Sequence, residues 1–381
     1  MFTEVQIENY KSIQSLKIGL GRVNVFIGEN GCGKSNILEA IALAGAAAGN
    51  KLDNEFLHPR GIRVTEPEFM RSAFDKENIT KEIKIDLKKN NEFVLSFLIQ
   101  NENKDYSNWE YTLREMPEQI NENWEDVEVL NLLKNDELSP NEIVFRLNQL
   151  SARSSARSTE RLRPLKSFVI YSPENSTLRT FAEEGQVQPL GTKGEGLLKL
   201  LRVLSNTPEK IDEIKKRLEL IDWFDDFKIH QDSDIERTIQ VKDRYLDKDL
   251  PYFNQRSSNE GFLFLMFYFA LFVSDDTPKF FAIDNIENAL NPKLCTRLIQ
   301  ELVELAKKYD KQVIFTTHNP AVLDGLDLSD DEQRLFTIYR NIYGHTKAKR
   351  VYAPEPLDDD DPVLLSEAFM NGYIGGLPNN F

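Results

Sequence analysis

The sequence predicts an α/β protein in which a mixed, largely parallel central sheet carries an inserted, mostly helical lobe. A glycine-rich turn at residues 28–35 stands between an apolar strand-like run and an alanine-rich helical stretch. The last third of the chain alternates helix and strand, which is the βαβ order of a parallel sheet. Between these parts, residues 117–255 are largely helical in pattern.

The N-terminal part of the core, residues 1–116, is predicted to hold several short strands and one long helix. Apolar residues alternate around Val5 and Ile7 and again around Leu16 and Ile18, and residues 23–27 form a third strand that leads into the turn. A helix with its N-terminus at the turn is predicted for residues 36–48, and further strands for residues 81–87, 92–100 and 109–114.

Residues 117–255 are predicted to form the inserted lobe. Helical periodicity covers residues 117–150 and 194–221, while residues 167–171 form a strand that returns the chain to the sheet. Strand-like pieces stand near Lys228 and at residues 238–241.

A serine-rich basic segment at residues 153–166 is predicted to be a mobile loop. It sets a single acid, Glu160, against five basic residues: Arg153, Arg157, Arg161, Arg163 and Lys166. The formal net charge of −15 argues against a wholly basic surface that coats nucleic acid. This segment is the candidate local contact with nucleic acid.

The C-terminal part, residues 256–381, completes the predicted core. Its pattern indicates an apolar helix, a strand, a second helix and a second strand at residues 261–273, 279–283, 292–308 and 312–317. Short strands follow, then an acidic run at residues 358–361 and a helix-like stretch at residues 363–371. A solvated surface is the commoner meaning of such an acidic run.

Composition excludes several classes of protein. The longest apolar stretch falls short of the roughly 20 residues that a membrane span needs, and the first residues lack the pattern of a signal peptide. The two cysteines, Cys32 and Cys295, have neither the number for a disulfide framework nor the spacing for a metal site. We therefore expect a soluble protein of the reducing cytoplasm with no membrane contact.

The turn at residues 28–35 satisfies the phosphate-loop pattern GxxxxGK[ST] and has the strand before it and the helix after it that this pattern requires. Its glycines let successive backbone N–H groups point at phosphates. The Lys34 ammonium is expected to reach the β- and γ-phosphates, and the Ser35 hydroxyl to ligate Mg²⁺. ATP and Mg²⁺ are thus the predicted cofactors, with these loop residues binding ATP: Gly28, Asn30, Gly31, Cys32, Gly33, Lys34, Ser35 and Asn36.

Asp284 is the candidate second metal ligand. It ends the apolar run at residues 279–283, as the Walker-B carboxylate does in phosphate-loop enzymes. An aspartate after a strand is also a common turn or cap residue. The phosphate loop in the same chain favours the metal role.

The remaining motifs resemble those of ABC-type ATPase heads, the group that includes SMC proteins and OLD-like ATPases. Residues 280–292, FFAIDNIENALNP, resemble the Walker-B strand and D-loop, and residues 315–318, FTTH, resemble the strand that ends in the switch histidine. His318 follows Asp284 by 318 − 284 = 34 residues, enough for one helix and one strand. The resemblance covers most of the chain.

Residues 257–262, SSNEGF, resemble the signature motif in part. Asn259 stands where the family usually has the signature serine, and Glu260 and Gly261 keep the expected pattern. The alternative is an ordinary helix N-cap. In ABC-type heads the signature of one subunit faces the γ-phosphate of another, so the resemblance implies a homo-oligomer, a dimer or higher, with ATP between the heads.

Asn285 departs from the family pattern, which places the catalytic glutamate directly after the Walker-B aspartate. An amide cannot accept the proton of the attacking water, and loss of such a base costs about 10² to 10⁴ in rate. Two alternatives follow: hydrolysis is slow and ATP acts as a clamp, or Glu287 serves as the base. The residues expected at the catalytic position are Glu287, His318 and Asn285.

The N-terminal pattern IENYKSI, the C-terminal motifs and a helical insert that is small beside the arms of SMC proteins are most similar to OLD-like bacterial ATPases. Many of these act in phage defence beside a separate nuclease or toxin, as in Septu- and PARIS-type systems. The resemblance implies an ATPase that regulates such an effector partner. The alternative is a DNA-repair or DNA-end-sensing ATPase that contacts nucleic acid through the basic segment. The sequence shows no HNH-like nuclease motif and no sustained heptads of an SMC arm, and the large insert disfavours a transporter subunit.

Overall fold

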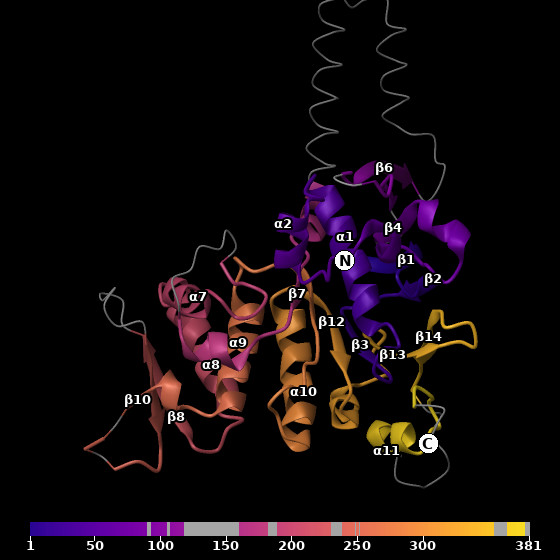
Figure 1. The fold of residues 1–381 in the computed structure, drawn as a ribbon. Helices are drawn as coiled ribbons and strands as arrows, with labels where there is room; N and C mark the ends of the chain where they lie inside the picture. The colour runs from indigo at the N-terminus through magenta and orange to yellow at the C-terminus, as the bar shows by residue number, and fades with distance from the viewer. Residues whose placement is uncertain are drawn as a thin grey trace, which may run out of the picture.

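The structure is a computed structural model that describes residues 1–89, 93–104, 107–117, 160–181, 189–229, 238–247, 249–250, 252–353 and 364–377. The strands of these residues form three sheets (Figure 1). Among the described residues, no helix is both long and apolar enough to cross a membrane.

A six-stranded sheet with the order β14-β13-β3-β12-β11-β7 lies at the centre. Its strands, in chain order, are β3 (Val23–Ile27), β7 (Ile170–Tyr171), β11 (Phe280–Ile283), β12 (Gln312–Thr317), β13 (Gln333–Arg340) and β14 (Thr346–Val351). All neighbours pair in parallel except β14, which is antiparallel to β13. The predicted mixed, largely parallel sheet is confirmed.

Helices cover both faces of this sheet. Val23, Val25 and Ile27 of β3 pack in one buried cluster with α9 (Glu260–Val273) and α10 (Pro292–Lys308). Phe26, which points to the other face, packs in a second cluster with α1 (Lys34–Ala48). Because successive side chains of a strand alternate between faces, a strand buried on both sides is mostly apolar, and the one polar residue of β3, Asn24, bonds its amide to Gly21 O and Val313 O.

A five-stranded antiparallel sheet, β2-β1-β4-β5-β6, shares the buried cluster of α1. Its strands are β1 (Phe2–Tyr10), β2 (Ile13–Gly19), β4 (Ile83–Lys89), β5 (Phe93–Gln100) and β6 (Glu110–Pro117). The helix lies between two sheets and is therefore buried nearly all round. The side chain of Gln312 joins the sheets, since its Oε1 accepts from Phe2 N at 2.9 Å and its Nε2 donates to Phe2 O at 2.6 Å.

The described part of residues 117–255 combines helices with a small sheet. After β7 come α6 (Asn175–Arg179), α7 (Leu197–Leu204) and α8 (Pro208–Leu218). The three-stranded sheet β10-β9-β8 is formed by β8 (Phe224–Ile229), β9 (Ile239–Asp243) and β10 (Phe253–Asn254), and its core residues pack in the same cluster as α9. The boundaries of the predicted lobe stay a prediction.

Short elements complete the described chain: α2 (Asn54–Leu57), η1 (His58–Arg60), α3 (Pro67–Met70), η2 (Lys76–Thr80), η3 (Gln255–Ser257), η4 (Pro320–Gly325) and α11 (Leu365–Met370). The predicted helix at residues 363–371 corresponds to α11. The acidic run at residues 358–361 lies outside the described residues.

The prediction of a mobile loop at residues 153–166 is wrong for the part that the structure describes. Residues 160–166 are helical, and this helix buries Leu162 and Leu165 in the cluster of α1. Gly45 of α1 permits the contact, because a Cβ there would lie 2.5 Å from Leu165 O. The Arg60 guanidinium donates to Lys166 O at 2.8 Å at the end of the helix. Tertiary packing thus overrides the local loop signal.

Candidate functional site

The loop at residues 28–35 joins β3 to α1, as predicted, and its backbone requires glycine at Gly33. This residue has φ +108°, and a Cβ there would lie 2.0 Å from Thr346 Oγ1. Gly33 is also the N-cap residue of α1, so the helix has no N-cap side chain to bond its first N–H groups, and its first turn has no acid. A helix N-terminus of this kind favours bound anions.

Polar contacts from distant segments hold the loop. Thr346 Oγ1 donates to Cys32 O at 2.8 Å and lies 2.7 Å from Ser12 Oγ. The Asn36 amide donates to the same Ser12 oxygen at 2.6 Å, and Arg340 Nε donates to Gly31 O at 2.8 Å. The sequence did not predict the roles of Ser12, Thr346 and Arg340. No local pattern marks residues that support a loop when they lie far from it along the chain.

Lys34 is buried within the loop that it belongs to. Its Nζ donates to Gly28 O at 2.8 Å and Glu29 O at 3.1 Å, and it lies 3.4 Å from His318 Nδ1. Burial lowers the pKa of Lys34. Burial, and then the charge of Lys34, lowers the pKa of His318, because two neighbouring cations disfavour each other. The predicted switch histidine therefore does lie beside the phosphate loop.

Ser35 and Asp284, predicted as the two metal ligands, lie side by side. Ser35 Oγ donates to Asp284 Oδ2 at 3.1 Å. Thr316, on β12, donates its hydroxyl to Asp284 Oδ1 and accepts the Asn285 N–H at 2.9 Å. A hydroxyl and a carboxylate that converge in this way are a suitable ligand pair for Mg²⁺. Thr316 belongs to the FTTH segment noted in the sequence, but its role was not predicted: it orients the carboxylate.

Glu287 points its carboxylate to the turn after β12. Its Oε1 accepts the His318 N–H at 2.8 Å, while its Oε2 is buried without a hydrogen-bond partner in the part of the chain that the structure describes. Burial and the nearby Glu287 charge raise the pKa of Tyr268 and raise that of Cys295 to about 11. An orphaned buried carboxylate oxygen at this place fits a site that receives a water molecule or a cation.

Asn285 occupies the left-handed region of the backbone, with φ 55°. Asparagine tolerates this conformation better than most residues do. Its N–H contact with Thr316 holds it at the strand end, directly beside the predicted metal ligand Asp284. The residue that departs from the ABC pattern is thus part of the site.

A cavity of about 440 Å³ opens beside the phosphate loop. Its lining includes Asn36, which follows the loop, and Arg340, which donates to Gly31 O of the loop. The lining also contains Lys11 and Arg63. Both cations pair with the buried carboxylate of Glu39 at 2.5 Å.

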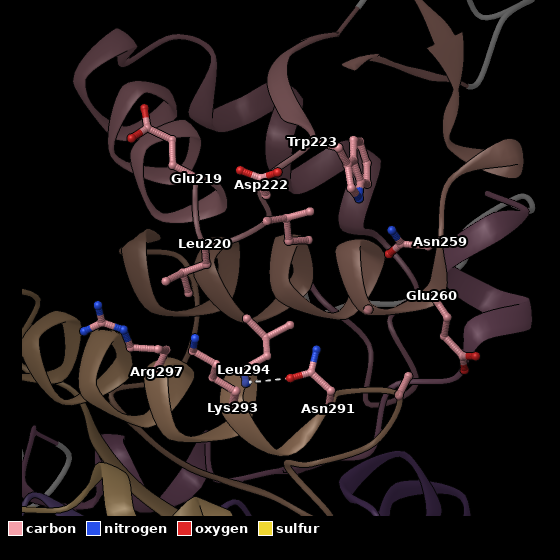
Figure 2. Close-up of a pocket in the computed structure, with 13 residues that line it drawn as sticks. Glu219, Leu220, Asp222, Trp223, Asn259, Glu260, Asn291, Lys293, Leu294 and Arg297 are labelled. Atoms are coloured by element: carbon pink, nitrogen blue, oxygen red, sulfur yellow. Dashed lines mark hydrogen bonds between the residues drawn. The ribbon is translucent and has the colours of Figure 1, made fainter. Parts of the chain in front are cut away.

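The three signature-like residues lie on a different cavity, of about 770 Å³ (Figure 2). Asn259 accepts the Phe262 N–H at 2.8 Å, which is the helix N-cap of the alternative interpretation. Glu260 and Gly261 line this cavity together with the D-loop residues Ala289 and Asn291. No residue of the phosphate loop lines it, so the predicted cofactor-binding residues form two separate groups.

The described cations of the basic segment lie on the helix at residues 160–166. Arg161 is engaged already, since its guanidinium lies 3.6 Å from a Glu115 oxygen and 4.7 Å from the centre of the Phe93 ring. Arg163 lines a cavity of about 500 Å³. Arg153 and Arg157 lie outside the described residues.

Comparison with known proteins agrees with this geometry. The family model described as "AAA domain, putative AbiEii toxin, Type IV TA system" matches residues 23–324. A crystal structure of an SMC head bound to the C-winged helix domain of ScpA matches with 14% identity and a TM-score of 0.58, over 92% of this chain and 97% of that one. An SMC head with an extended coiled coil, bound to a ScpA domain from Pyrococcus furiosus, matches with 13% identity and a TM-score of 0.52, over 92% and 96%.

A shorter match joins the chain to the DNA replication and repair protein RecF of Bacillus mycoides (strain KBAB4). The two are 39% identical over 54 residues, which is 14% of each chain. The chain therefore matches only a small part of that relative. Together the comparisons confirm the predicted fold, that of an ABC-type ATPase head as seen in SMC heads, and the family model covers more than half of the chain.

Proposed function

We propose a function from the premise that the chain belongs to this AAA-domain family and is an ABC-type ATPase. In the proposal, the chain binds ATP and Mg²⁺, hydrolyses ATP slowly, and associates with a second copy through its ATP-bound heads. Its nucleotide state then controls a partner effector, a nuclease or toxin, in bacterial phage defence. The observation that carries the proposal is the contact between Ser35 and Asp284, which joins the phosphate loop to the Walker-B strand.

The residues at this contact fit the two cofactors. The loop N–H groups, the N-terminus of α1 and the Lys34 ammonium would hold the phosphates, and Ser35 and Asp284 would hold Mg²⁺. Bound Mg²⁺ neutralises phosphate charge. Lys34→Ala is expected to abolish ATP binding in calorimetry, with an unfolding midpoint that shows an intact fold. ATP binding by this variant with unchanged affinity contradicts the assignment.

Slow turnover follows from the amide at position 285. Glu287, two residues on, is the alternative base, but the His318 N–H already holds one of its oxygens. Asn285→Glu is expected to raise steady-state ATP turnover by about tenfold or more, since a positioned base contributes about 10² to 10⁴. If this variant is unchanged while Glu287→Gln loses turnover, Glu287 is the working base and the proposal of a missing base is wrong.

Association of two heads is supported by the separation of the phosphate loop from the signature-like residues. The ABC resemblance implies that the signature of one head faces the nucleotide of the other. Sedimentation is expected to show a larger species with Mg²⁺ and ATP, which Glu260→Arg prevents without loss of ATP binding. Glu209→Arg, in the first turn of α8, makes the same charge change away from this cavity and serves as the control. One sedimentation coefficient with and without ATP argues against the assembly.

The effector is proposed from the resemblance to OLD-like ATPases and from the family description, which names a toxin system. Expression of this chain with its neighbouring reading frame is expected to protect bacteria from phage, and Lys34→Ala is expected to remove the protection. Equal phage titres with and without the intact pair argue against the role in defence.

A second candidate function is DNA-repair or DNA-end sensing, which the RecF match and the basic helix favour. Binding to DNA would then fall steeply with salt. It would also be lost when the segment's arginines are replaced by alanine: Arg153, Arg157, Arg161 and Arg163. Absence of DNA binding at low salt excludes this candidate.

A further inference from the structure

Two aromatic side chains on the wall of the 440 Å³ cavity are half exposed. Phe69, on α3, is 55% exposed and Phe74 is 49% exposed. Large aromatic residues that remain this exposed on a cavity wall commonly mark a binding surface. The same cavity contains Asn36, the residue after the predicted metal ligand Ser35, so it leads directly from the phosphate loop.

Neighbouring residues hold the ring of Phe74 in place. The His345 ring contacts it edge-on, with the ring centres 5.3 Å apart, and the Arg340 guanidinium lies 6.0 Å from its centre. Gly344, in the turn between β13 and β14, has φ +79°, and a Cβ there would lie 3.2 Å from the Phe74 ring. This close approach lets the turn support the ring. An aromatic surface held in this way loses little entropy when a ligand stacks on it.

Charge around the cavity favours an anion. Lys11, Arg63, Arg71 and Arg340 line it, and the buried Glu39 pairs with the first two. The Arg71 guanidinium is fully buried and already donates to Lys81 O and Asn101 O, so three available cations and one carboxylate leave a formal charge of 3 − 1 = +2. A nucleotide fits such a cavity, because its base can stack on the aromatic wall while its phosphates lie on the loop beside the cations.

Two polar side chains of the cavity, Ser12 and Asn36, are poorly placed to read a base edge. Ser12 and Asn36 bond to each other at 2.6 Å, and Asn36 Oδ1 also accepts from Arg63 at 3.0 Å. These groups hold the protein together. Stacking, in contrast, accepts any base and grows with the area of the ring system.

We propose that Phe69 and Phe74 form the stacking surface for the base of a purine nucleoside triphosphate, and that stacking area, not the pattern of base-edge groups, sets the preference. This inference rests on the proposed function, because it uses the same phosphate loop. It predicts that ATP and GTP bind with comparable affinity and that pyrimidine nucleotides bind more weakly.

The test is calorimetry with Mg²⁺ and four ligands: ATP, GTP, CTP and inorganic tripolyphosphate. The variants are Phe74→Leu and Phe69→Leu, with Phe74→Tyr to restore the ring and Tyr352→Leu as a control. Tyr352 is also a well-exposed aromatic, but it follows the far end of β14. We expect Phe74→Leu to weaken ATP binding by about 5- to 100-fold. Tripolyphosphate should bind within about twofold of wild type, since it has no base to stack.

Any of three calorimetric results overturns the inference: unchanged ATP affinity in both leucine variants, equal losses for ATP and tripolyphosphate, or CTP binding as tight as ATP binding. A change in association of the heads without a change in ATP affinity also overturns it, because the aromatic surface would then be a protein interface. Failure of the proposed function looks different, since the wild-type chain would bind neither ATP nor tripolyphosphate.

Discussion

Glu287 accepts a hydrogen bond at 2.8 Å from the backbone N–H of His318, and so joins the turns that follow β11 and β12. The His318 ring in turn lies 3.4 Å from the Lys34 ammonium of the phosphate loop. The histidine thus stands between a carboxylate predicted to be catalytic and a cation predicted to bind the phosphates of ATP. Its protonation reports on each of them.

The pKa of His318 is expected to lie below the usual value of about 6.5, because burial and the Lys34 charge both disfavour the imidazolium. Lys34→Ala removes one of these effects and is expected to raise the pKa. Glu287→Gln removes a charge that favours the imidazolium and is expected to lower it further. An NMR titration of the imidazole in the three proteins measures both shifts. Shifts of the same sign in the two variants contradict this arrangement.

Asp284→Asn is expected to weaken ATP binding by about tenfold or more when Mg²⁺ is present, and to change it little in EDTA, since a ligand is lost only from the metal. Thr316→Val keeps the shape of the side chain but removes the hydroxyl that holds the Asp284 carboxylate. Support of this kind is typically worth about 10- to 100-fold in metal affinity. Calorimetry with and without Mg²⁺ checks both variants, and equal losses in the two buffers argue against the metal role.

Gly33→Ala is expected to destabilise the protein far more than Gly31→Ala. Both glycines have positive φ, so each substitution strains the backbone by about 1–2 kcal/mol. A Cβ at Gly31 meets no atom within 4 Å, whereas one at Gly33 lies 2.0 Å from Thr346 Oγ1. Denaturant unfolding compares the two variants. Equal unfolding midpoints for the two variants contradict the close packing of Thr346 against Gly33.

Stability is expected to rise with pH above neutrality because of Lys311, a buried residue away from the site. Its ammonium donates to Ser274 O, Thr277 O and Thr277 Oγ1 at 2.7, 3.1 and 2.8 Å. Burial lowers the pKa of Lys311 to about 7 from an ordinary value of 10.5. The unfolded chain therefore binds more protons between pH 7 and 10.5, and unfolding becomes less favourable as pH rises in that window.

Lys311→Met removes this dependence. The difference in unfolding free energy between wild type and variant is expected to grow in favour of wild type by up to about 1.4 kcal/mol per pH unit from pH 7 to 9. Denaturant titrations at three pH values measure it. A difference that does not change with pH shows that Lys311 keeps its proton in the folded state.

Much of the fold could be predicted because its strongest signals are local. The apolar run of β3, the alanine-rich α1 and the amphipathic α10 carry the period of their own secondary structure. The basic segment shows where this reasoning ends. Its serines and arginines predict a loop, but Leu162 and Leu165 find a buried surface on α1, and residues 160–166 become a helix. The energy of that contact cannot be read from the segment alone.

By itself, the sequence determined the phosphate-loop pattern, the aspartate that follows β11 and the amide at Asn285, because each is a short pattern whose chemistry belongs to the residues within it. Only the tertiary structure decided which groups stand around them. The hydrogen bond from Thr316 to Asp284 was not predicted, although the spacing of their two segments was noted, and Thr346 and the two phenylalanines beside the loop come from segments that no spacing rule connects to it. Packing of the two sheets on α1 brings these segments together, since burial of apolar surface acts between residues at any separation along the chain.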